Sequence, residues 1–341
     1  MKLKTIISII YINLKHNIYK LLNKKISPYK ILINLTDLCN SKCNFCDIWK
    51  IKPKNEITMF DIKNSLKGVE DNIYWVALSG GEVSLVKYFY ELIDFLKDNC
   101  KNLQIIAITT NSLTPNRTFE FAKYIQDKEI DTHITISLDG DEKIHDKIRG
   151  VPGNYKKCEI LKKKLDDQKI SNCYGLTVSE ANYNYIMSSS NELKKFKAVT
   201  FVHSEGIYAK ENISEDSKIL DGMKRISRYF KISKLQDIIE YIHIKIAIKF
   251  LENQRKKNII KCDVLNSSIH IMPNGDLKPC MFMESLGNIK SENINQILSS
   301  EKTINTKKKI EENNCPKCWM NCYSPHSIMQ KPLQSLRYLF F

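Results

Sequence analysis

Residues 39–46 of the chain read Cys39-Asn40-Ser41-Lys42-Cys43-Asn44-Phe45-Cys46, and the fold expected for the whole sequence follows from this loop. It follows an apolar run, 31–35, with the composition of a β-strand. Three thiolates at C-x3-C-x2-C spacing on one loop can hold three corners of a cubic iron–sulfur cluster, whereas the ordinary four-iron site uses four cysteines. The next cysteine is Cys100. A cluster here would therefore keep one iron open to a non-protein ligand, which is typical of a metal centre that does chemistry.

A zinc knuckle is the alternative for this loop. Structural zinc sites use paired cysteines with a fourth cysteine or histidine close by. The nearest histidines are His16 and His133, and neither stands at ligand spacing. The sequence therefore favours an iron–sulfur cluster held by Cys39, Cys43 and Cys46.

Length and composition are those of a globular enzyme. The 341 residues suffice for one large domain and a smaller one. The 53 Lys and Arg residues against 38 Asp and Glu give a net charge of +15. No helix-turn-helix, finger or aromatic–basic pattern accompanies this charge, so we expect no nucleic-acid partner. Most of the 11 cysteines fall into two metal-type groups, which favours reduced thiols and a cytoplasmic location over disulfides.

Strand-like and helix-like segments alternate from residue 31 to about 206. A capping box, Thr58-x-x-Asp61, opens one helix, and Pro115 precedes another at 117–126. The alternation predicts an α/β fold with a parallel sheet, and its length fits a partial (β/α)6 barrel of the TIM type. Chemistry in such barrels gathers at the carboxyl ends of the strands. The expected strands are 31–36, 74–79, 103–109, 132–138, 172–178 and 198–203.

The cysteine loop resembles the signature of the radical S-adenosylmethionine (SAM) enzymes. The resemblance implies that the open iron of a 4Fe–4S cluster chelates SAM. Reductive cleavage of SAM would then give a 5′-deoxyadenosyl radical that removes a hydrogen atom from the substrate. It also implies that Phe45 packs near the adenine. Ser79-Gly80-Gly81-Glu82, after the second strand, resembles the GGE motif of the family, which holds the SAM amino group, although Val83 stands where proline is common.

Further polar residues follow the third and fourth strands. Asn111 lies in Thr109-Thr110-Asn111-Ser112, where relatives often carry Thr-Asn-Gly, and it either contacts the ligands or satisfies the backbone of its own loop. Ser137-Leu138-Asp139-Gly140, with His145-Asp146 and Ile148-Arg149-Gly150, resembles the signature of radical SAM enzymes that carry a SPASM or twitch extension. The resemblance places Ser137 at the SAM carboxylate or ribose, and Asp139 in the same cofactor site.

Other residues near these strands are weaker candidates. Thr177 and His203 close the fifth and sixth strands, where they would border the adenosine or the substrate. His145 is a candidate proton carrier because an unperturbed imidazole titrates near neutral pH, but a structural role is the stronger expectation. Arg149 and Asp146 are expected to brace the loop by ion pairing.

Five cysteines near the C-terminus form the second group. The hairpin signal Asn274-Gly275 lies between short apolar runs and is expected to bring Cys262 and Cys280 together. Cys315 and Cys318, at C-x2-C spacing, add two more thiols, so four possible metal ligands become available. The set resembles an auxiliary iron–sulfur site of the twitch type, and a zinc ribbon is the alternative. Because a full SPASM domain has seven cysteines for two clusters, we expect one auxiliary 4Fe–4S cluster held by four of these five: Cys262, Cys280, Cys315, Cys318 and Cys322.

The sequence divides into five expected parts. They are a basic amphipathic N-terminal helix (1–30), a radical SAM core (31–210), a helical bridge (211–260), a cluster domain built from a hairpin and a helix (261–325) and an apolar basic tail (326–341). The N-terminal helix either packs on the barrel or lies on a membrane surface, and the tail is a second candidate for membrane contact. Peripheral membrane association therefore stays open beside the cytoplasmic location.

These features predict a radical SAM enzyme whose auxiliary cluster assists electron transfer. The substrate is a peptide, a protein side chain or a small molecule, and the reductant is a protein such as flavodoxin or ferredoxin. No added peptide-recognition domain is visible before the barrel, which favours a small molecule or an envelope-related substrate. Met281 follows the hairpin cysteine where sulfatase-maturing relatives place an acidic base, which argues against a direct transfer of their chemistry. The alternative class is a non-catalytic iron–sulfur protein that carries electrons or is structural.

Overall fold

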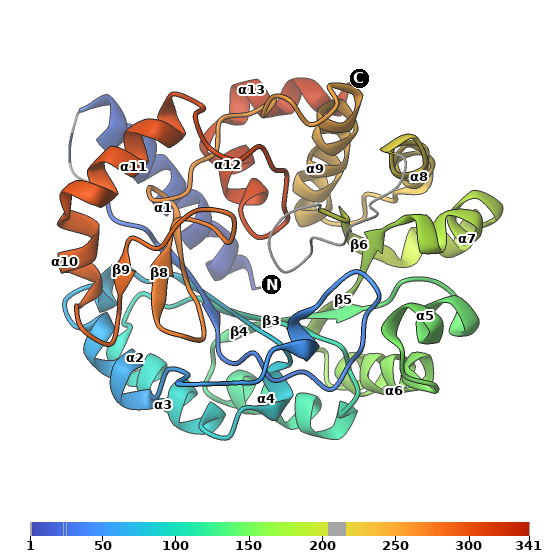
Figure 1. Ribbon diagram of the computed structural model, residues 1–341, viewed down its shortest axis with the longest axis horizontal. Coiled ribbons are helices and arrows are strands. Elements are labelled where there is room, and N and C mark those ends of the chain that lie inside the picture. The colour runs from blue at the N-terminus through green and yellow to red at the C-terminus, as the bar shows by residue number, and fades with distance from the viewer. Residues whose placement is uncertain (1, 23, 25, 204–215, 341) are drawn as a thin grey trace.

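The computed structural model describes residues 2–22, 24, 26–203 and 216–340. Within these residues the central sheet has nine strands, in the order β6-β5-β4-β3-β2-β1-β7-β8-β9 (Figure 1). Neighbouring strands from β6 to β7 pair in parallel, whereas β7, β8 and β9 pair antiparallel. The strands are β1 (Lys30–Asn34), β2 (Trp75–Ser79), β3 (Ile105–Thr110), β4 (Asp131–Ser137), β5 (Ser171–Val178), β6 (Phe196–Phe201), β7 (Ser268–Ile271), β8 (Asp276–Lys278) and β9 (Gly287–Asn288).

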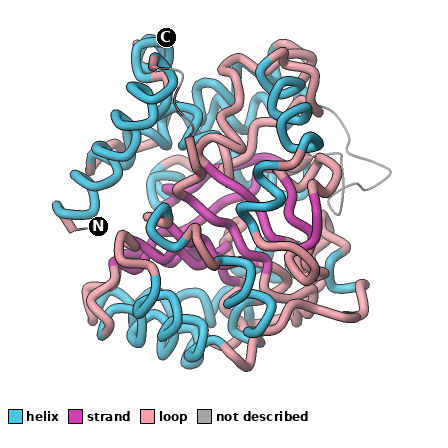
Figure 2. Tube along the Cα trace, turned by 90° about the vertical axis from the view of Figure 1, so that its left-hand side faces the viewer, coloured by secondary structure: helices cyan, strands magenta, loops and turns pink. Residues whose placement is uncertain are grey.

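Helices cover both faces of the sheet. Figure 1 shows α2, α3, α4 and α6 below the strands and α1, α9, α12 and α13 above them, with α10 at the left beside β9 and α5 at the right beside β5. Figure 2 shows both chain ends on the same side of the molecule, with α1 along its outer edge. The helices are α1 (Leu3–Leu21), α2 (Met59–Leu66), α3 (Phe89–Asn99), α4 (Pro115–Asp127), α5 (Glu142–Arg149), α6 (Asn154–Asp167), α7 (Tyr183–Ser188), α8 (Asp216–Tyr229), α9 (Leu235–Glu252), α10 (Ile294–Ser299), α11 (Glu301–Glu311), α12 (Ser324–Gln330) and α13 (Pro332–Leu336).

The two faces of the sheet differ in burial. In β4, Ile134 and Ile136 are fully buried, whereas His133, Thr135 and Ser137 on the opposite face are half-buried. This follows from the two-residue period of a strand, which sends successive side chains to opposite faces. The apolar face packs into the hydrophobic core. The half-buried polar face carries Ser137, which stands at the carboxyl end of β4.

The predicted α/β fold with a partial barrel is confirmed. Each of the six expected strands of the barrel is present within two residues of its expected ends, and the sheet is open. The capping box of α2 is also present, because Thr58 Oγ1 accepts a hydrogen bond from the Asp61 backbone N–H and the Asp61 carboxylate accepts one from the Thr58 N–H. Local sequence signals therefore placed most of the core.

The C-terminal hairpin is attached directly to the barrel. Strands β7 and β8 form the predicted antiparallel hairpin, with Gly275 in its turn at a φ of +92°. Strand β7 also pairs in parallel with β1, where Lys30 lies opposite Ser268. The sequence predicted the hairpin but not this pairing, which extends the core sheet into the C-terminal cysteine region.

The expected helical bridge contains α8 and α9, and its residues 211–215 lie outside the described part of the chain. The parts expected at 1–30 and 326–341 likewise contain residues that are not described: 1, 23, 25 and 341. Among the described helices, none has the length and apolar character needed to cross a membrane.

Candidate active site at the cysteine loop

The three cysteines of the loop gather after the carboxyl end of β1. Burial, together with the nearby Cys43 and Cys39 thiols, raises the pKa of Cys46 to about 11. Burial also raises the pKa of Cys39, and Cys43 contributes to that rise. Thiols influence one another in this way only at short range. The structure therefore brings together the three sulfurs that the spacing predicted.

Polar hydrogens are directed at these sulfurs. Nη1 of Arg149 lies 3.6 Å from Sγ of Cys43. Oγ of Ser41 lies 3.3 Å from the same sulfur, but it donates its own hydrogen to the Arg149 carbonyl. Nδ2 of Asn111 lies 3.8 Å from Sγ of Cys39. Hydrogen bonds to cysteine sulfur stabilise the thiolate form and tune iron–sulfur clusters.

The donor set suits an iron–sulfur cluster. Each thiolate of such a cluster binds a different iron, so the sulfurs need not share one ion position. No set of three or more His, Cys, Asp and Glu side chains in the described ranges is arranged to hold a single metal ion. Three clustered thiols with N–H donors around them fit a cluster that leaves one iron for another ligand.

The turn after α5 supports the cysteine loop. The backbone N–H of Lys42 donates to the carbonyl of Arg149, and that of Asn44 donates to the carbonyl of Ile148, both at 2.9 Å. Gly150 caps α5 at a φ of +64°, and a Cβ there would lie 2.8 Å from the Lys42 carbonyl oxygen. The Ile-Arg-Gly stretch is therefore a backbone support for the cysteines.

The glycine pair after β2 packs against the same loop. The Gly81 N–H donates to the Thr36 carbonyl at 2.7 Å, and the Glu82 N–H donates to the Leu38 carbonyl at 2.9 Å. A Cβ on Gly81 would lie 2.2 Å from the Leu38 oxygen, a distance no side chain can occupy. Gly80 has a φ of +132° and the same close approach to Thr36. Both glycines are needed for this contact.

The carboxylate of Glu82 is satisfied by the protein. The side chain is fully buried, and Oε2 accepts a hydrogen bond from the Asn111 N–H at 2.8 Å. Oε1 accepts from Thr110 Oγ1 at 2.9 Å and from the Ser84 N–H at 3.1 Å. Glu82 thus ties the ends of β2 and β3 together. Contact between this motif and the SAM amino group stays a prediction.

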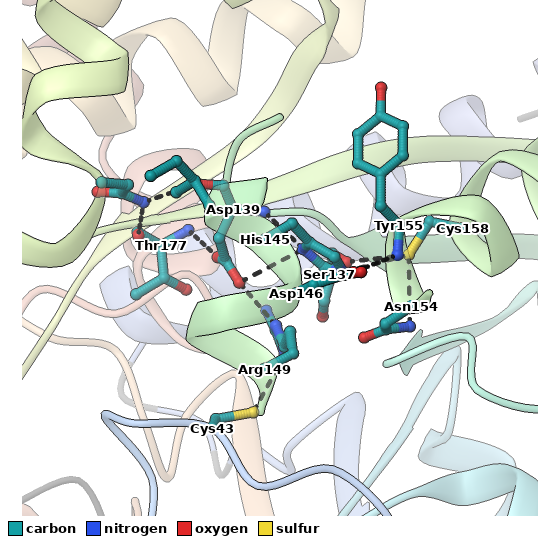
Figure 3. Close-up of polar contacts among 12 residues, drawn as sticks. Cys43, Ser137, Asp139, His145, Asp146, Arg149, Asn154, Tyr155, Cys158 and Thr177 are labelled. Carbon is teal, nitrogen blue, oxygen red and sulfur yellow. Dashed lines mark hydrogen bonds and ion pairs between the residues drawn. The ribbon is translucent and has the colours of Figure 1, made fainter. Parts of the chain in front are cut away.

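Asp139 and Arg149 form the centre of a buried polar network (Figure 3). Nε of Arg149 lies 2.6 Å from Oδ2 of Asp139, and Oδ1 accepts from the Thr177 N–H at 3.3 Å. Burial opposes the charge of Arg149, but Asp139 and the Cys43 thiol together raise its pKa. The expected bracing by Arg149 is present, with Asp139 as its partner. Asp146 braces the next helix through the N–H groups of Gly153 and Tyr155.

The two candidate histidines are buried. His145 Nδ1 accepts a hydrogen bond from the Asp139 N–H at 3.1 Å, and burial together with Arg149 lowers the pKa of His145 to about 4. His203 lies beside the rings of Phe201 and Phe282, and burial lowers the pKa of His203 to about 3. Both rings are neutral near pH 7, and the contacts of His145 fit a structural role.

The remaining candidates lie around the loop. Ser79, Ser137 and Thr177 stand half-buried at or near the ends of β2, β4 and β5. The guanidinium of Arg149 lies over the ring of Phe45, 5.6 Å from its centroid. Their direct contacts with SAM stay predictions.

Three of the C-terminal cysteines, Cys262, Cys280 and Cys315, lie near one another, whereas Cys322 has a different charged neighbour. Burial raises the pKa of Cys262 to about 12, and the Cys280 and Cys315 thiols contribute to this rise. Cys318 completes the C-x2-C pair with Cys315. The charged neighbour of Cys322 is instead Lys30, whose Nζ donates to the Cys322 carbonyl at 3.0 Å.

Two contributors to the site were not found from the sequence. Glu56 accepts hydrogen bonds from Thr36 Oγ1 and from the Asp37 N–H, at 2.9 and 2.6 Å, and so anchors the loop before the first cysteine. Ser41 donates to the carbonyl of Arg149 at 3.1 Å. Glu56 belongs to no motif found in the sequence, and Ser41 stands within the cysteine motif without being one of its ligands, so only the folded contacts reveal their roles.

Two family models match the chain. Residues 33–178 match the model described as the radical SAM superfamily, and residues 262–323 match the iron–sulfur cluster-binding domain named SPASM. The matched ranges contain the two cysteine groups described above.

Curated relatives share parts of this chain. The sporulation killing factor maturation protein SkfB of Bacillus subtilis is 27% identical over 161 residues, which is 46% of this chain and 37% of that protein. A cysteine-type anaerobic sulfatase-maturating enzyme of Clostridium novyi is 34% identical over 125 residues, or 33% of this chain and 32% of the enzyme. These alignments thus span only about a third of each relative.

Solved structures share the fold over most of the chain. The structure of anSMEcpe with bound AdoMet and the Cp18Cys peptide has a TM-score of 0.62 at 18% identity, and the match covers 92% of this chain and 97% of that chain. SuiB of Streptococcus suis bound to the precursor peptide SuiA has a TM-score of 0.60 at 20% identity, covering 86% and 70%. At these identities the likeness concerns the fold alone.

Proposed function

Because the chain belongs to the radical SAM superfamily and carries a SPASM-type iron–sulfur domain, we propose that it cleaves SAM reductively and abstracts a hydrogen atom from a peptide or protein side chain. The observation that carries the proposal is the meeting of the Cys39, Cys43 and Cys46 thiols on a loop held by the Gly80-Gly81 backbone. When bound, a 4Fe–4S cluster with SAM on its open iron supplies the electron that generates the 5′-deoxyadenosyl radical.

The residues of this chain would hold and shield the reacting groups. Cys39, Cys43 and Cys46 would hold the SAM cluster. The half-buried polar face of the sheet, with Ser79, Ser137 and Thr177 at or near its carboxyl edge, would receive SAM and the substrate. Parallel barrels bind their ligands at this edge.

The auxiliary cluster is proposed at four C-terminal cysteines. Cys262, Cys280 and Cys315 influence one another's thiols, which supports their grouping, and Cys318 is two residues beyond Cys315. Cys322 is the proposed spare, because its carbonyl and thiol face Lys30. An auxiliary cluster near the barrel would pass an electron to or from the substrate radical, and a flavodoxin- or ferredoxin-type protein would supply the reducing electron.

The substrate class rests on the relatives. SkfB is named for maturation of a killing factor, and the SuiB structure contains a precursor peptide. These names favour a peptide over the small molecule that the sequence alone favoured. The metal-type spacing of the two cysteine groups supports a reducing compartment such as the cytoplasm.

Anaerobic reconstitution tests the proposal. With dithionite and SAM, the wild type is expected to release 5′-deoxyadenosine, and Cys43→Ala is expected to release none above background. Cys100→Ala is the matched control and is expected to release 5′-deoxyadenosine like the wild type. Cys100 is also a buried cysteine, but it caps the C-terminus of α3 and lies outside both cysteine groups. A wild-type protein that binds iron but forms no 5′-deoxyadenosine would instead support a non-catalytic electron carrier.

A further inference from the structure

The helix α1 has its apolar side turned to solvent. Seven of its side chains are 50–84% exposed and apolar: Leu3, Ile7, Ile10, Tyr11, Leu14, Ile18 and Leu21. We call Leu3, Ile7, Ile10, Leu14, Ile18 and Leu21 the outer stripe, because their spacing of three or four residues keeps them on one face of a helix. Figure 2 shows α1 on the outer edge of the molecule.

The buried side of α1 is in contrast partly polar. Asn13 Oδ1 accepts hydrogen bonds from Tyr29 Oη at 3.0 Å and from Gln330 Nε2 at 2.7 Å. Lys20 Nζ pairs with Asp263 at 2.6 Å, and His16 packs edge-on against Tyr29. A solvent-facing helix normally shows the reverse distribution, with its apolar residues inward. The outer stripe is therefore built to contact something apolar.

The charge around α1 identifies the partner. The first acidic residue of the chain is Asp37, whereas Lys4 and Lys24 stand exposed towards the two ends of the helix. Lys2, just before the helix, is paired with Asp131. Lys15 and Lys24 lie over the ring of Tyr19, 5.5 and 5.7 Å from its centroid. An apolar face flanked by lysines, on a helix that has no acidic residue of its own, matches the interface of an anionic bilayer.

A second copy of the chain is a poor match for this surface. Two α1 helices would bring lysines together with no acidic residue to pair them, whereas helical dimers use complementary charges beside their apolar seam.

The C-terminal segment adds apolar groups on the same side of the molecule. Gln330, which contacts α1, is the last residue of α12, and α13 begins two residues later at Pro332. Beyond it, Leu333 and Phe340 are 90% and 88% exposed. The two chain ends lie on one side in Figure 2. We propose that α1, assisted by this segment, binds the protein to the surface of an anionic membrane, with the outer stripe in the headgroup region and the lysines at the lipid phosphates.

Vesicle flotation with the reconstituted full-length protein tests the proposal. Phosphatidylcholine vesicles with and without phosphatidylglycerol are compared at low and high salt. The wild type is expected to float with the anionic vesicles at low salt, and high salt should weaken this binding because it screens the lysines. The triple variant Ile7→Gln/Leu14→Gln/Ile18→Gln is expected to bind at least about tenfold less, because three apolar groups no longer enter the bilayer.

A matched triple variant separates this effect from general hydrophobicity. Phe60, Ile160 and Ile304 are also exposed apolar residues but lie on α2, α6 and α11. Phe60→Gln/Ile160→Gln/Ile304→Gln is expected to bind vesicles like the wild type. Thermal unfolding and SAM cleavage without vesicles check that both variants are folded.

Three outcomes would overturn the proposal. They are no flotation with anionic vesicles, equal loss of binding in the two triple variants, and a dimer that the outer-stripe variant dissociates in the absence of vesicle binding. SAM cleavage is measured separately, so a failed membrane test leaves the proposed reaction standing.

Discussion

Arg149 and Asp139 form an ion pair inside the protein, with Nε of Arg149 2.6 Å from Oδ2 of Asp139. Asp139 is fully buried, and its position at the end of β4 fixes where the guanidinium can lie. From there, Nη1 of Arg149 reaches Sγ of Cys43 at 3.6 Å. One side chain thus links the carboxyl edge of the sheet to a proposed cluster ligand.

Removal of Arg149 is expected to destabilise the fold and to weaken iron retention. Arg149→Met leaves the Asp139 carboxylate buried without its partner, which costs about 3–5 kcal/mol. The exposed pair of Lys123 and Asp127 is the control, because Lys123→Met is expected to cost less than about 1 kcal/mol. Urea unfolding and iron analysis measure both effects. Equal stability of the two variants would show that the buried pair is dispensable.

Iron content distinguishes the C-terminal cysteines. Cys322→Ser is expected to keep the iron content of the wild type, because Cys322 lies beside Lys30 and outside the cysteine group. Cys262→Ser is expected to lose about four iron atoms per chain, the content of one 4Fe–4S cluster. Iron and sulfide analysis with electron paramagnetic resonance gives the readout. Loss of iron from Cys322→Ser would make this residue a ligand.

Local patterns predicted the parts of this protein that depend on neighbouring residues. The cysteine spacings, the Asn274-Gly275 turn and the alternation of strands and helices each lie within a short window of sequence. They were sufficient for the α/β class and for the positions of the six barrel strands along the chain.

Contacts between residues far apart in the sequence could not be predicted from such local patterns. The Arg149 guanidinium reaches a cysteine 106 positions away in the chain. Glu82 matches a ligand-binding motif, yet its carboxylate accepts three hydrogen bonds from residues of the protein itself. The parallel pairing of β7 with β1 likewise depends on how the C-terminal region folds back. None of these contacts follows from composition or periodicity.

Ser112→Gly is expected to stabilise the protein. Ser112 has a φ of +63°, in a left-handed conformation that costs a side-chain-bearing residue about 1–2 kcal/mol. Glycine relieves this strain but is more flexible when unfolded, so a net gain of about 0.5–1 kcal/mol is expected. Ser65→Gly, at a buried serine inside α2, should lose about 1 kcal/mol. Denaturant unfolding of both variants tests the opposite signs.

Acid is expected to destabilise the protein through its histidines. Burial lowers the pKa of His16, with Lys20 and Lys15 contributing, to about 4 from the ordinary 6.5. The unfolded chain therefore binds more protons between these values, and the free energy of unfolding falls as the pH drops from 6.5 to about 4. Burial lowers the pKa of the other histidines in the same direction: His133, His145, His203, His243, His270 and His326.

One variant measures how much His16 contributes to this pH dependence. His16→Leu keeps an apolar packing group at the site and removes the titration, so the slope of unfolding free energy against pH should fall by up to about 1.4 kcal/mol per pH unit. Thr5→Val replaces another buried polar residue of α1 without removing a titrating group and should keep the wild-type slope. An unchanged slope in His16→Leu would mean that His16 is protonated equally in the folded and unfolded chain.

Gly81→Ala is expected to displace the cysteine loop. The added Cβ would lie 2.2 Å from the Leu38 carbonyl oxygen and 2.8 Å from that of Asp37, and neither backbone atom can move without shifting Cys39. Iron content and 5′-deoxyadenosine formation should therefore fall at least about tenfold, the loss expected when groups that orient metal ligands are disturbed. Gly222→Ala is the matched control, because its Cβ meets only apolar side-chain atoms, the nearest at 3.0 Å in Val178, and a helical alanine is favourable. If Gly81→Ala retains wild-type iron and activity, the glycine pair does not hold the loop.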